Sequence, residues 1–167
     1  MTRVRLKSVH RERDFLLTAE LAHEIWREHY VGIISSEQIE YMLEHFQSIS
    51  AIKTAQAQGC EYYIIRAGCA NVGYLAIEPC HPRGKMFLSK FYILKEYRGH
   101  GYAHGALAEI REKARALHLE HIWLTVAKNN TPSIAAYERM GFVNTEDICT
   151  DIGGGFVMND HIFELKV

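Results

Sequence analysis

A glycine-rich turn, Arg98-Gly99-His100-Gly101-Tyr102-Ala103, constrains the fold of this chain more than any other segment. It follows the apolar run Met86–Leu94, which is typical of a buried strand, and it opens a helix predicted over Gly101–Leu117. This order places several backbone N–H groups and a helix N-terminus around one point, which attracts phosphate. Glycine lets the backbone approach a bulky anion, and Arg98 adds a positive charge that can pair with phosphate oxygens. We therefore expect the pyrophosphate site of a nucleotide-type cofactor at this turn.

Two common phosphate-binding motifs do not fit the turn. The dinucleotide fingerprint GxGxxG requires a glycine at position 104, where the chain has His104. The next predicted strand is followed by Lys128, so no carboxylate ends it to hold a ribose. The Gly-Lys-Ser/Thr of a P-loop is absent from the sequence. A nicotinamide-dependent oxidoreductase is therefore disfavoured.

The remaining elements follow from hydrophobic periodicity, capping residues and glycine turns. They alternate in a way that predicts a mixed α/β (α+β) sheet of roughly seven strands and four helices. The expected elements are a strand over Arg3–Lys7, a helix over Arg11–His29, a helix after the capping pair Ser35 and Gln38, a helical turn or loop over Ile49–Gln58, strands over Glu61–Arg66, Val72–Glu78 and Met86–Leu94, the helix over Gly101–Leu117, a strand over His121–Val126, a helix from the N-cap Thr131 to Met140, and strands over Phe142–Thr150 and Phe156–Leu165.

Composition limits the classes of function. A length of 167 residues predicts one domain over 1–167, and a net charge of −1 without long charged runs argues against a nucleic-acid binder. No apolar run is long enough to span a bilayer, and the polar N-terminus has no secretory signal, so we expect no membrane association. The four cysteines form no CxxC pair, which favours reduced thiols in the cytoplasm. The closely spaced histidines come with no carboxylate or thiolate set, so no metal site is expected.

A second informative segment follows one strand after the glycine turn. Ser133 and Tyr137 are four residues apart, so they share one face of the predicted helix, and Asn130 precedes that helix. Taken alone, the segment has a simpler interpretation, in which Tyr137 is a core aromatic residue and Asn130 a turn residue.

Together the two segments resemble the general-control-related N-acetyltransferase (GNAT) superfamily. Its acetyl-CoA signature Q/R-x-x-G-x-G/A is matched by Arg98, Gly101 and Ala103. Its usual continuation, an Asn followed by a helix ending like YExxGF, is matched by Asn130 and by Tyr137–Phe142. The motifs cover the chain from about Tyr74 onward, and the N-terminal half matches by element order alone. The resemblance implies the acyl-CoA N-acyltransferase fold.

The resemblance also implies direct transfer of acetyl from acetyl-CoA, as co-substrate, to an amine. In that case the amides of the glycine turn hold the pyrophosphate, Tyr92 and Ile93 offer backbone groups to the pantetheine arm, and Asn130 and Ser133 contact the arm from the other side. Tyr137 is the expected general acid to the CoA thiolate, because a phenol with a pKa of about 10 is protonated at neutral pH.

The general base does not follow from the motif. Some family members use a glutamate on the strand before the phosphate turn, but here that strand reads KMFLSKFYIL, with Ser89 and Lys90 and no carboxylate. Glu78 is the first candidate, acting through water, and His81 is the second. Glu78 can equally be a solvated carboxylate at a strand end.

The acceptor site is expected across the sheet from the cofactor. His29 and Tyr30 end the first helix and are the predicted substrate contacts, whereas Trp26 fits the core face of that helix. The carboxylates Asp147, Asp151 and Asp160 of the last hairpin can attract a cationic amine or can simply be solvated. The resemblance favours a small-molecule amine, with a polyamine as first guess. A non-catalytic acyl-CoA sensor and another acyl donor stay open. Protein N-termini, amino acids and aminoglycosides stay open as acceptors, and so does a homodimer.

Overall fold

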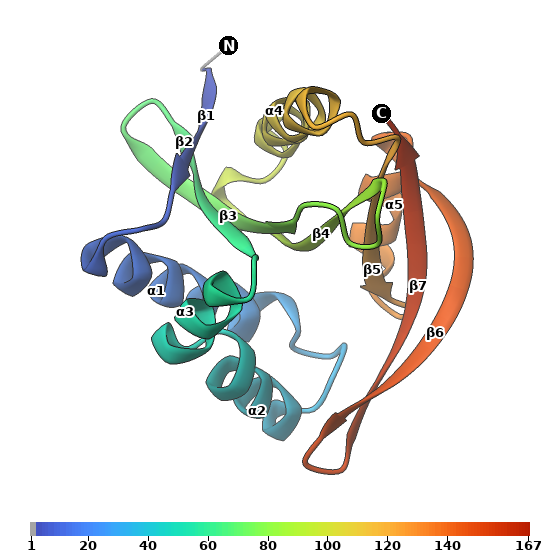
Figure 1. Ribbon diagram of the computed structural model, residues 1–167. Helices are drawn as coiled ribbons and strands as arrows, with labels where there is room; N and C mark the ends of the chain where they lie inside the picture. The colour runs from blue at the N-terminus through green and yellow to red at the C-terminus, as the bar shows by residue number, and fades with distance from the viewer. Residues whose placement is uncertain (1–2) are drawn as a thin grey trace.

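Seven strands form one mixed sheet in the computed structural model, which describes residues 3–167. The strand order is β1-β2-β3-β4-β5-β7-β6, and neighbouring strands are antiparallel except β4 and β5, which are parallel (Figure 1). The strands are β1 (Val4–Ser8), β2 (Glu61–Ala67), β3 (Ala70–Glu78), β4 (Lys85–Ile93), β5 (His121–Ala127), β6 (Val143–Gly153) and β7 (Phe156–Lys166). The mixed α/β class and the strand number predicted from the sequence are confirmed.

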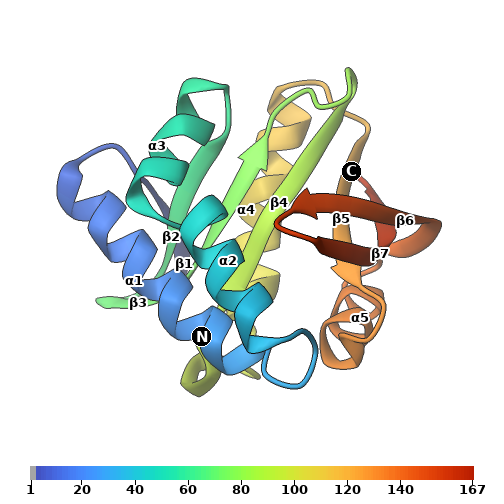
Figure 2. The same cartoon turned by 90° about the horizontal axis from the view of Figure 1, so that it is seen from below.

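Helices cover both faces of this sheet (Figures 1 and 2). Helices α1 to α3 bury their apolar stripes on one face, where Ile25, Leu43 and Ile52 pack into the same cluster as Tyr74 of β3. Helix α4 covers the other face, and α5 packs partly buried side chains against the same cluster. The described helices are α1 (Glu12–His29), α2 (Ser36–Phe46), α3 (Ile49–Ala57), α4 (Tyr102–Ala116), α5 (Thr131–Arg139) and a short 3-10 turn, η1 (Lys95–Tyr97).

The structure has one α-helix more than the four predicted, because Ile49–Ala57 forms the helix α3. The apolar pattern of this segment is short, so the sequence predicted only a helical turn or loop over Ile49–Gln58. The hydroxyl of Ser48 accepts a hydrogen bond from the N–H of Ala51, which caps the first turn, and Ile52 is fully buried against the sheet. A single buried anchor and a cap stabilise a helix that periodicity alone did not reveal.

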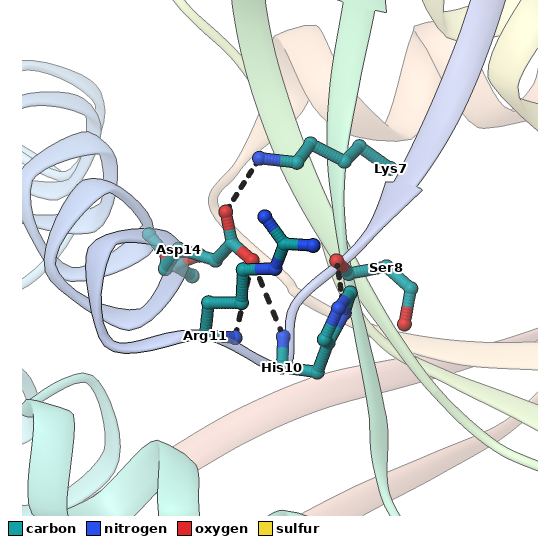
Figure 3. A network of polar contacts seen from close by, with 6 residues as sticks. Lys7, Ser8, His10, Arg11 and Asp14 are labelled. Carbon is teal, nitrogen blue, oxygen red and sulfur yellow. Dashed lines mark hydrogen bonds and ion pairs between the residues drawn. The ribbon is translucent and has the colours of Figure 1, made fainter.

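An ionic network fixes the start of α1 against β1 (Figure 3). The carboxylate of Asp14 accepts hydrogen bonds from the ammonium group of Lys7 and from the backbone N–H groups of His10 and Arg11. The side chain of Asp14 is 1% exposed. The bond from Lys7, opposed by burial and supported by the two backbone donors, lowers the pKa of Asp14 to about 2. The contact therefore stabilises the fold with Asp14 ionised.

The sheet splits between β4 and β5, and this split positions the site. Lys85–Phe87 pairs with His121–Trp123, and no pairing of these two strands continues beyond Phe87 in the described chain. Strand β3 stays paired with β4 along its length, and a register shift between Ala76 and Ile77 bends β4. The edge of β4 that faces β5 is consequently left open.

The last hairpin closes the far side of the split. Strand β7 pairs with β5 along the whole of β5, and the β6–β7 hairpin extends towards α2 (Figure 1). Gln38 donates to the carbonyl of Val157, and the hydroxyl of Tyr41 donates to the carbonyl of Ile152. In the part of the chain that the structure describes, no helix is long and apolar enough to cross a membrane.

Candidate active site

The glycine turn presents a row of free backbone amides. Gly99 and Gly101 have φ angles of 77° and 79°, a left-handed conformation that side chains disfavour. Helix α4 begins directly after Gly101, which caps it without a side-chain hydrogen bond. Within residues 3–167, the N–H groups from Gly99 to His104 donate to no other backbone group. Orphan donors at a helix N-terminus form an anion site, as the sequence predicts for a pyrophosphate.

The side chains around the turn brace its backbone. The guanidinium of Arg98 forms a bidentate pair with the Glu28 carboxylate at 2.8 and 3.2 Å, and its Nε donates to the carbonyl of Ile93 at 2.9 Å. Nδ1 of His100 donates to the Arg98 carbonyl at 2.9 Å, and the His100 ring stacks on Tyr102, with 5.7 Å between ring centroids. These contacts tie the turn to α1 and β4, and the Glu28 carboxylate offsets the charge of Arg98.

Two adjoining cavities run from this turn into the split of the sheet. The smaller cavity, of about 440 Å³, is lined by Arg98 and Ala103 at the turn. The larger cavity, of about 550 Å³, lies between β4, β5, α1, α2 and the last hairpin. Tyr92, Ser133 and Tyr137 line both cavities, so the two form one cleft. A cleft of this size with an anion site at one end can accommodate an extended ligand with a phosphate group.

Tyr137 lies where the two cavities meet. Its ring packs near those of Phe91, Phe142 and Phe163, with centroid distances of 6.4, 5.7 and 6.5 Å. Burial raises the pKa of the Tyr137 phenol well above its ordinary value, so the hydroxyl stays protonated at neutral pH. Tyr137 thus packs against the core, as the simpler interpretation of this segment predicts, and the same position leaves it in the cleft.

The start of α5 differs from the prediction. Asn130, rather than Thr131, is the N-cap, because its side chain accepts a hydrogen bond from the N–H of Ser133. The amide nitrogen of Asn130 lies 3.0 Å from Nε2 of His29, and the hydroxyl of Ser133 lies 3.4 Å from the same atom. Burial, followed by the charge of Arg98, lowers the pKa of His29, which is consistent with a neutral ring accepting from Asn130.

The two predicted substrate residues face different parts of the cleft. His29 lines the smaller cavity, on the side of the glycine turn, whereas Tyr30 lines the larger one. The hydroxyl groups of Tyr30 and Tyr92 are 2.9 Å apart, and burial raises the pKa of Tyr30 to about 12. Trp26 is 2% exposed and donates its indole N–H to the hydroxyl of Tyr74, so it is a core residue, as predicted.

Glu78 and His81 lie at the opposite end of β4 from the glycine turn. The Glu78 carboxylate is 3.8 Å from Nδ1 of His81, and the His81 ring stacks on Trp123. Neither Glu78 nor His81 lines the two cavities. A role of Glu78 as base through water stays a prediction.

The three hairpin carboxylates have different surroundings. Asp147 is exposed and pairs with Lys128 and His161, and Asp151 is exposed and accepts from the N–H of Gly153. Asp160 lines the larger cavity, is 4% exposed, and has a buried Oδ1 without a hydrogen-bond partner. Burial raises the pKa of Asp160 to about 6.

Lys90 also lines the larger cavity, a position that the sequence pattern did not predict for it. Its position opposite Ala76 in the register puts it on the sheet face covered by α1 to α3. Burial lowers the pKa of this lysine. Strand alternation could have placed Lys90 on that face, but the bend in β4 interrupts the simple alternation.

Comparisons with known proteins find relatives of this sequence and of this fold. The uncharacterized N-acetyltransferase YycN of Bacillus subtilis (strain 168) is 38% identical over 77 residues, which are 45% of this chain and 49% of YycN. The chain thus spans about half the length of the curated relatives that it matches. The PaiA N-acetyltransferase from Thermoplasma acidophilum, in complex with coenzyme A, has a TM-score of 0.80 at 21% identity, covering 98% of this chain and 99% of that one. A chimera of the spermidine N-acetyltransferase SpeG from Vibrio cholerae and hSSAT has a TM-score of 0.67 at 16% identity, covering 99% and 96%.

The similarity to the solved structures shows a shared fold. A family model covers a larger part of the sequence than the curated relatives do. The model described as the acetyltransferase (GNAT) family matches residues 18–142, a span that includes the glycine turn, the split between β4 and β5, and α5. The resemblance expected from the two motifs is confirmed: this chain belongs to the acetyltransferase (GNAT) family.

Proposed function

We propose that the protein is an N-acetyltransferase that moves the acetyl group of acetyl-CoA directly to a primary amine of a small molecule, in the cytoplasm. The observation that carries the proposal is the cleft itself. A row of free amides from Gly99 to His104 opens into it at one end, and Tyr137 lies at the junction of its two cavities. Family membership and the coenzyme A of the PaiA structure support the same donor.

The chain offers three sets of contacts to acetyl-CoA. The amides of the glycine turn would hold the pyrophosphate. The open edge of β4 at Tyr92 and Ile93 would pair with the pantetheine arm as an added strand does, and a backbone N–H there would polarise the thioester carbonyl. Asn130 and Ser133 would approach the arm from α5, and the Asn130 side chain also caps α5 and contacts His29.

Tyr137 is proposed as the general acid. As the amine nitrogen bonds to the carbonyl carbon, the carbon–sulfur bond breaks, and the Tyr137 hydroxyl donates its proton to the departing thiolate. The raised pKa of Tyr137 keeps its hydroxyl protonated at neutral pH, which an acid requires. Glu78 remains the proposed base, and a chain of water would have to connect it with the amine, since it lies outside both cavities.

The first acceptor to assay is a polyamine-like molecule, because the fold is shared with the SpeG chimera. A non-catalytic acyl-CoA sensor is the rival function. Calorimetric titration with acetyl-CoA, succinyl-CoA and NADPH, followed by thiol detection over an amine panel, separates the two. Binding of acetyl-CoA with thiol release supports the transferase, and binding without release for any acceptor supports the sensor. If neither acetyl-CoA nor succinyl-CoA binds, both the transferase and the sensor are excluded.

Tyr137→Phe tests the acid. Loss of general acid catalysis should lower kcat by roughly 10²–10⁴-fold without changing the affinity for acetyl-CoA. Tyr63→Phe is the matched control, because its hydroxyl donates to Glu61 and it lines neither cavity. An unchanged kcat in Tyr137→Phe would show that another group protonates the thiolate. Glu78→Gln tests the base, and an unshifted acid limb of its pH–rate profile would exclude Glu78.

A further inference from the structure

The larger cavity carries two charged groups of opposite sign that lack ionic partners. Its lining is mainly apolar and aromatic, and its charged residues are Lys90, Lys128 and Asp160. Lys128 pairs with Asp147 at 3.1 Å, and Asp147 lies outside the lining. Among the described residues, neither Lys90 nor Asp160 has an ionic partner within 4.0 Å. The cavity therefore offers one cation and one anion that are not engaged in an ion pair in the described part of the chain, with Glu78 and His161 as their respective more distant charged neighbours.

Asp160 is a costly residue at this position. It lies on β7 opposite Ala127 of β5, is 4% exposed, and keeps Oδ1 buried without a donor in the described chain. Buried polar oxygens are nearly always hydrogen-bonded, and an unpaired carboxylate is the most unfavourable case. A ligand that brings a positively charged N–H donor into the cavity would satisfy this oxygen.

Lys90 supplies the opposite charge from β4. Its ammonium group donates to the carbonyl of Ser89 at 3.3 Å, and this is its single hydrogen bond within residues 3–167. An ammonium group carries three donors, so the other two are available. Because β4 and β5 separate beyond Phe87, Lys90 and Asp160 come from the two sides of the split and do not pair with each other.

We propose that the acceptor is a zwitterion, whose anionic group, such as a carboxylate, is bound by Lys90 and whose amino group is bound as an ammonium by Asp160. That ammonium gives one proton through water to the proposed base before its nitrogen attacks the thioester. This inference rests on the proposed function and narrows its substrate class from small-molecule amines in general to zwitterions, in place of a polyamine-like acceptor. The apolar and aromatic lining suits a hydrocarbon body between the two charges. A diamine would satisfy Asp160 but would bring its second cation into a cavity that already holds the Lys90 ammonium, and like charges in such surroundings repel strongly.

The test compares matched acceptors by thiol release. Apolar α-amino acids and ω-amino acids of increasing length are each set against the monoamine that lacks the carboxylate and the diamine of equal length. A charged hydrogen bond in a partly desolvated site corresponds to roughly a ten- to hundredfold effect. The best zwitterion should therefore exceed its matched monoamine and diamine in kcat/KM by at least about tenfold.

Substitutions test the roles of Asp160 and Lys90 separately. Asp160→Asn should raise KM for every amine by roughly ten- to a hundredfold, whereas Asp147→Asn, in the same hairpin but outside the cavity, should not. Lys90→Met should abolish the advantage of the zwitterion over the monoamine, and Lys90→Glu should favour the diamine. Exposed Lys95→Gln is the control for loss of a lysine. Thermal unfolding verifies that each variant is folded. If Lys90→Met does not fold, Lys90→Gln replaces it.

Several outcomes overturn the inference. A wild-type preference for diamines, or a zwitterion preference that survives Lys90→Met, would contradict the assignment of Lys90. An unchanged KM in folded Asp160→Asn would contradict that of Asp160. Calorimetric titration of zwitterion and monoamine into protein saturated with CoA measures the same preference without turnover. Turnover of some amine without the zwitterion preference defeats this inference alone, whereas a protein that does not bind acetyl-CoA defeats the proposed function.

Discussion

Replacing Asp160 by asparagine should stabilise the protein at neutral pH while weakening its function. Burial raises the pKa of the Asp160 carboxyl from 3.8 to about 6, and the residue is 4% exposed. Each pKa unit corresponds to about 1.36 kcal/mol, so the ionised carboxylate costs the folded state up to about 3 kcal/mol. Because the folded state binds this proton more tightly than the unfolded state, stability falls as pH rises from about 4 to about 6. Above pH 6 the whole cost is present, and asparagine removes it.

The assay is urea-induced unfolding of the wild type and Asp160→Asn at several values of pH from 4 to 8. The difference in free energy of unfolding should shift in favour of the variant by about 3 kcal/mol between pH 4 and pH 7. In thermal unfolding, the same difference corresponds to an increase in Tm of roughly 6–12 °C for a chain of this size. The change with pH is the decisive quantity, since any cost of placing an amide in the cavity is the same at every pH.

Asp147→Asn is a control of opposite sign. His161, followed by Lys128, lowers the pKa of Asp147 through hydrogen bonds. This carboxylate therefore stabilises the fold above its ordinary pKa, and the stabilisation is lost as pH falls. Asp147→Asn should be less stable than the wild type at pH 7, and the difference should shrink towards low pH. A difference for Asp160→Asn that is flat with pH, or that grows against the variant as pH rises, would refute the reasoning.

Three further predictions concern the frame around the cleft. Asp14→Asn should lose about 1 to 2 kcal/mol of stability at pH 7, and urea unfolding should show the loss vanishing as pH falls from about 4 towards 2; a loss that persists at pH 2 would contradict an ionic cause. Gly73→Ala places a Cβ 2.1 Å from the Tyr92 carbonyl oxygen, so it should separate β3 from β4, destabilise the fold by about 1–3 kcal/mol and weaken acetyl-CoA binding in calorimetry; wild-type stability would show that the strands adjust freely. Gly101→Ala forces a side chain into a conformation with φ of 79°, which should cost about 1 kcal/mol and raise the Kd for acetyl-CoA; an unchanged Kd would argue against the turn as the pyrophosphate site.

Features encoded by neighbouring residues could be predicted from the sequence. Gly99 and Gly101 adopt the left-handed conformations that a tight turn before a helix requires, and Gly141 does the same after α5. The hydroxyl of Ser35 caps α2 through the N–H of Gln38, as the capping pair indicates. Such signals depend on residues a few positions apart, which is why the element order, the mixed sheet and the family could be predicted without a structure.

The tertiary structure decided which residues line the cleft. Asp147, Asp151 and Asp160 are equivalent in the sequence, yet Asp160 lines the larger cavity and the other two do not. Likewise, Glu78 was the expected base, but it lies beside His81 outside both cavities. The pattern of the chain encodes each strand and its two faces. Which side chains meet across the cleft depends on where β4 and β5 separate, and on the pairing of β7 with β5, which brings together residues tens of positions apart in the sequence. Those contacts result from long-range packing, which local periodicity and turn chemistry do not encode.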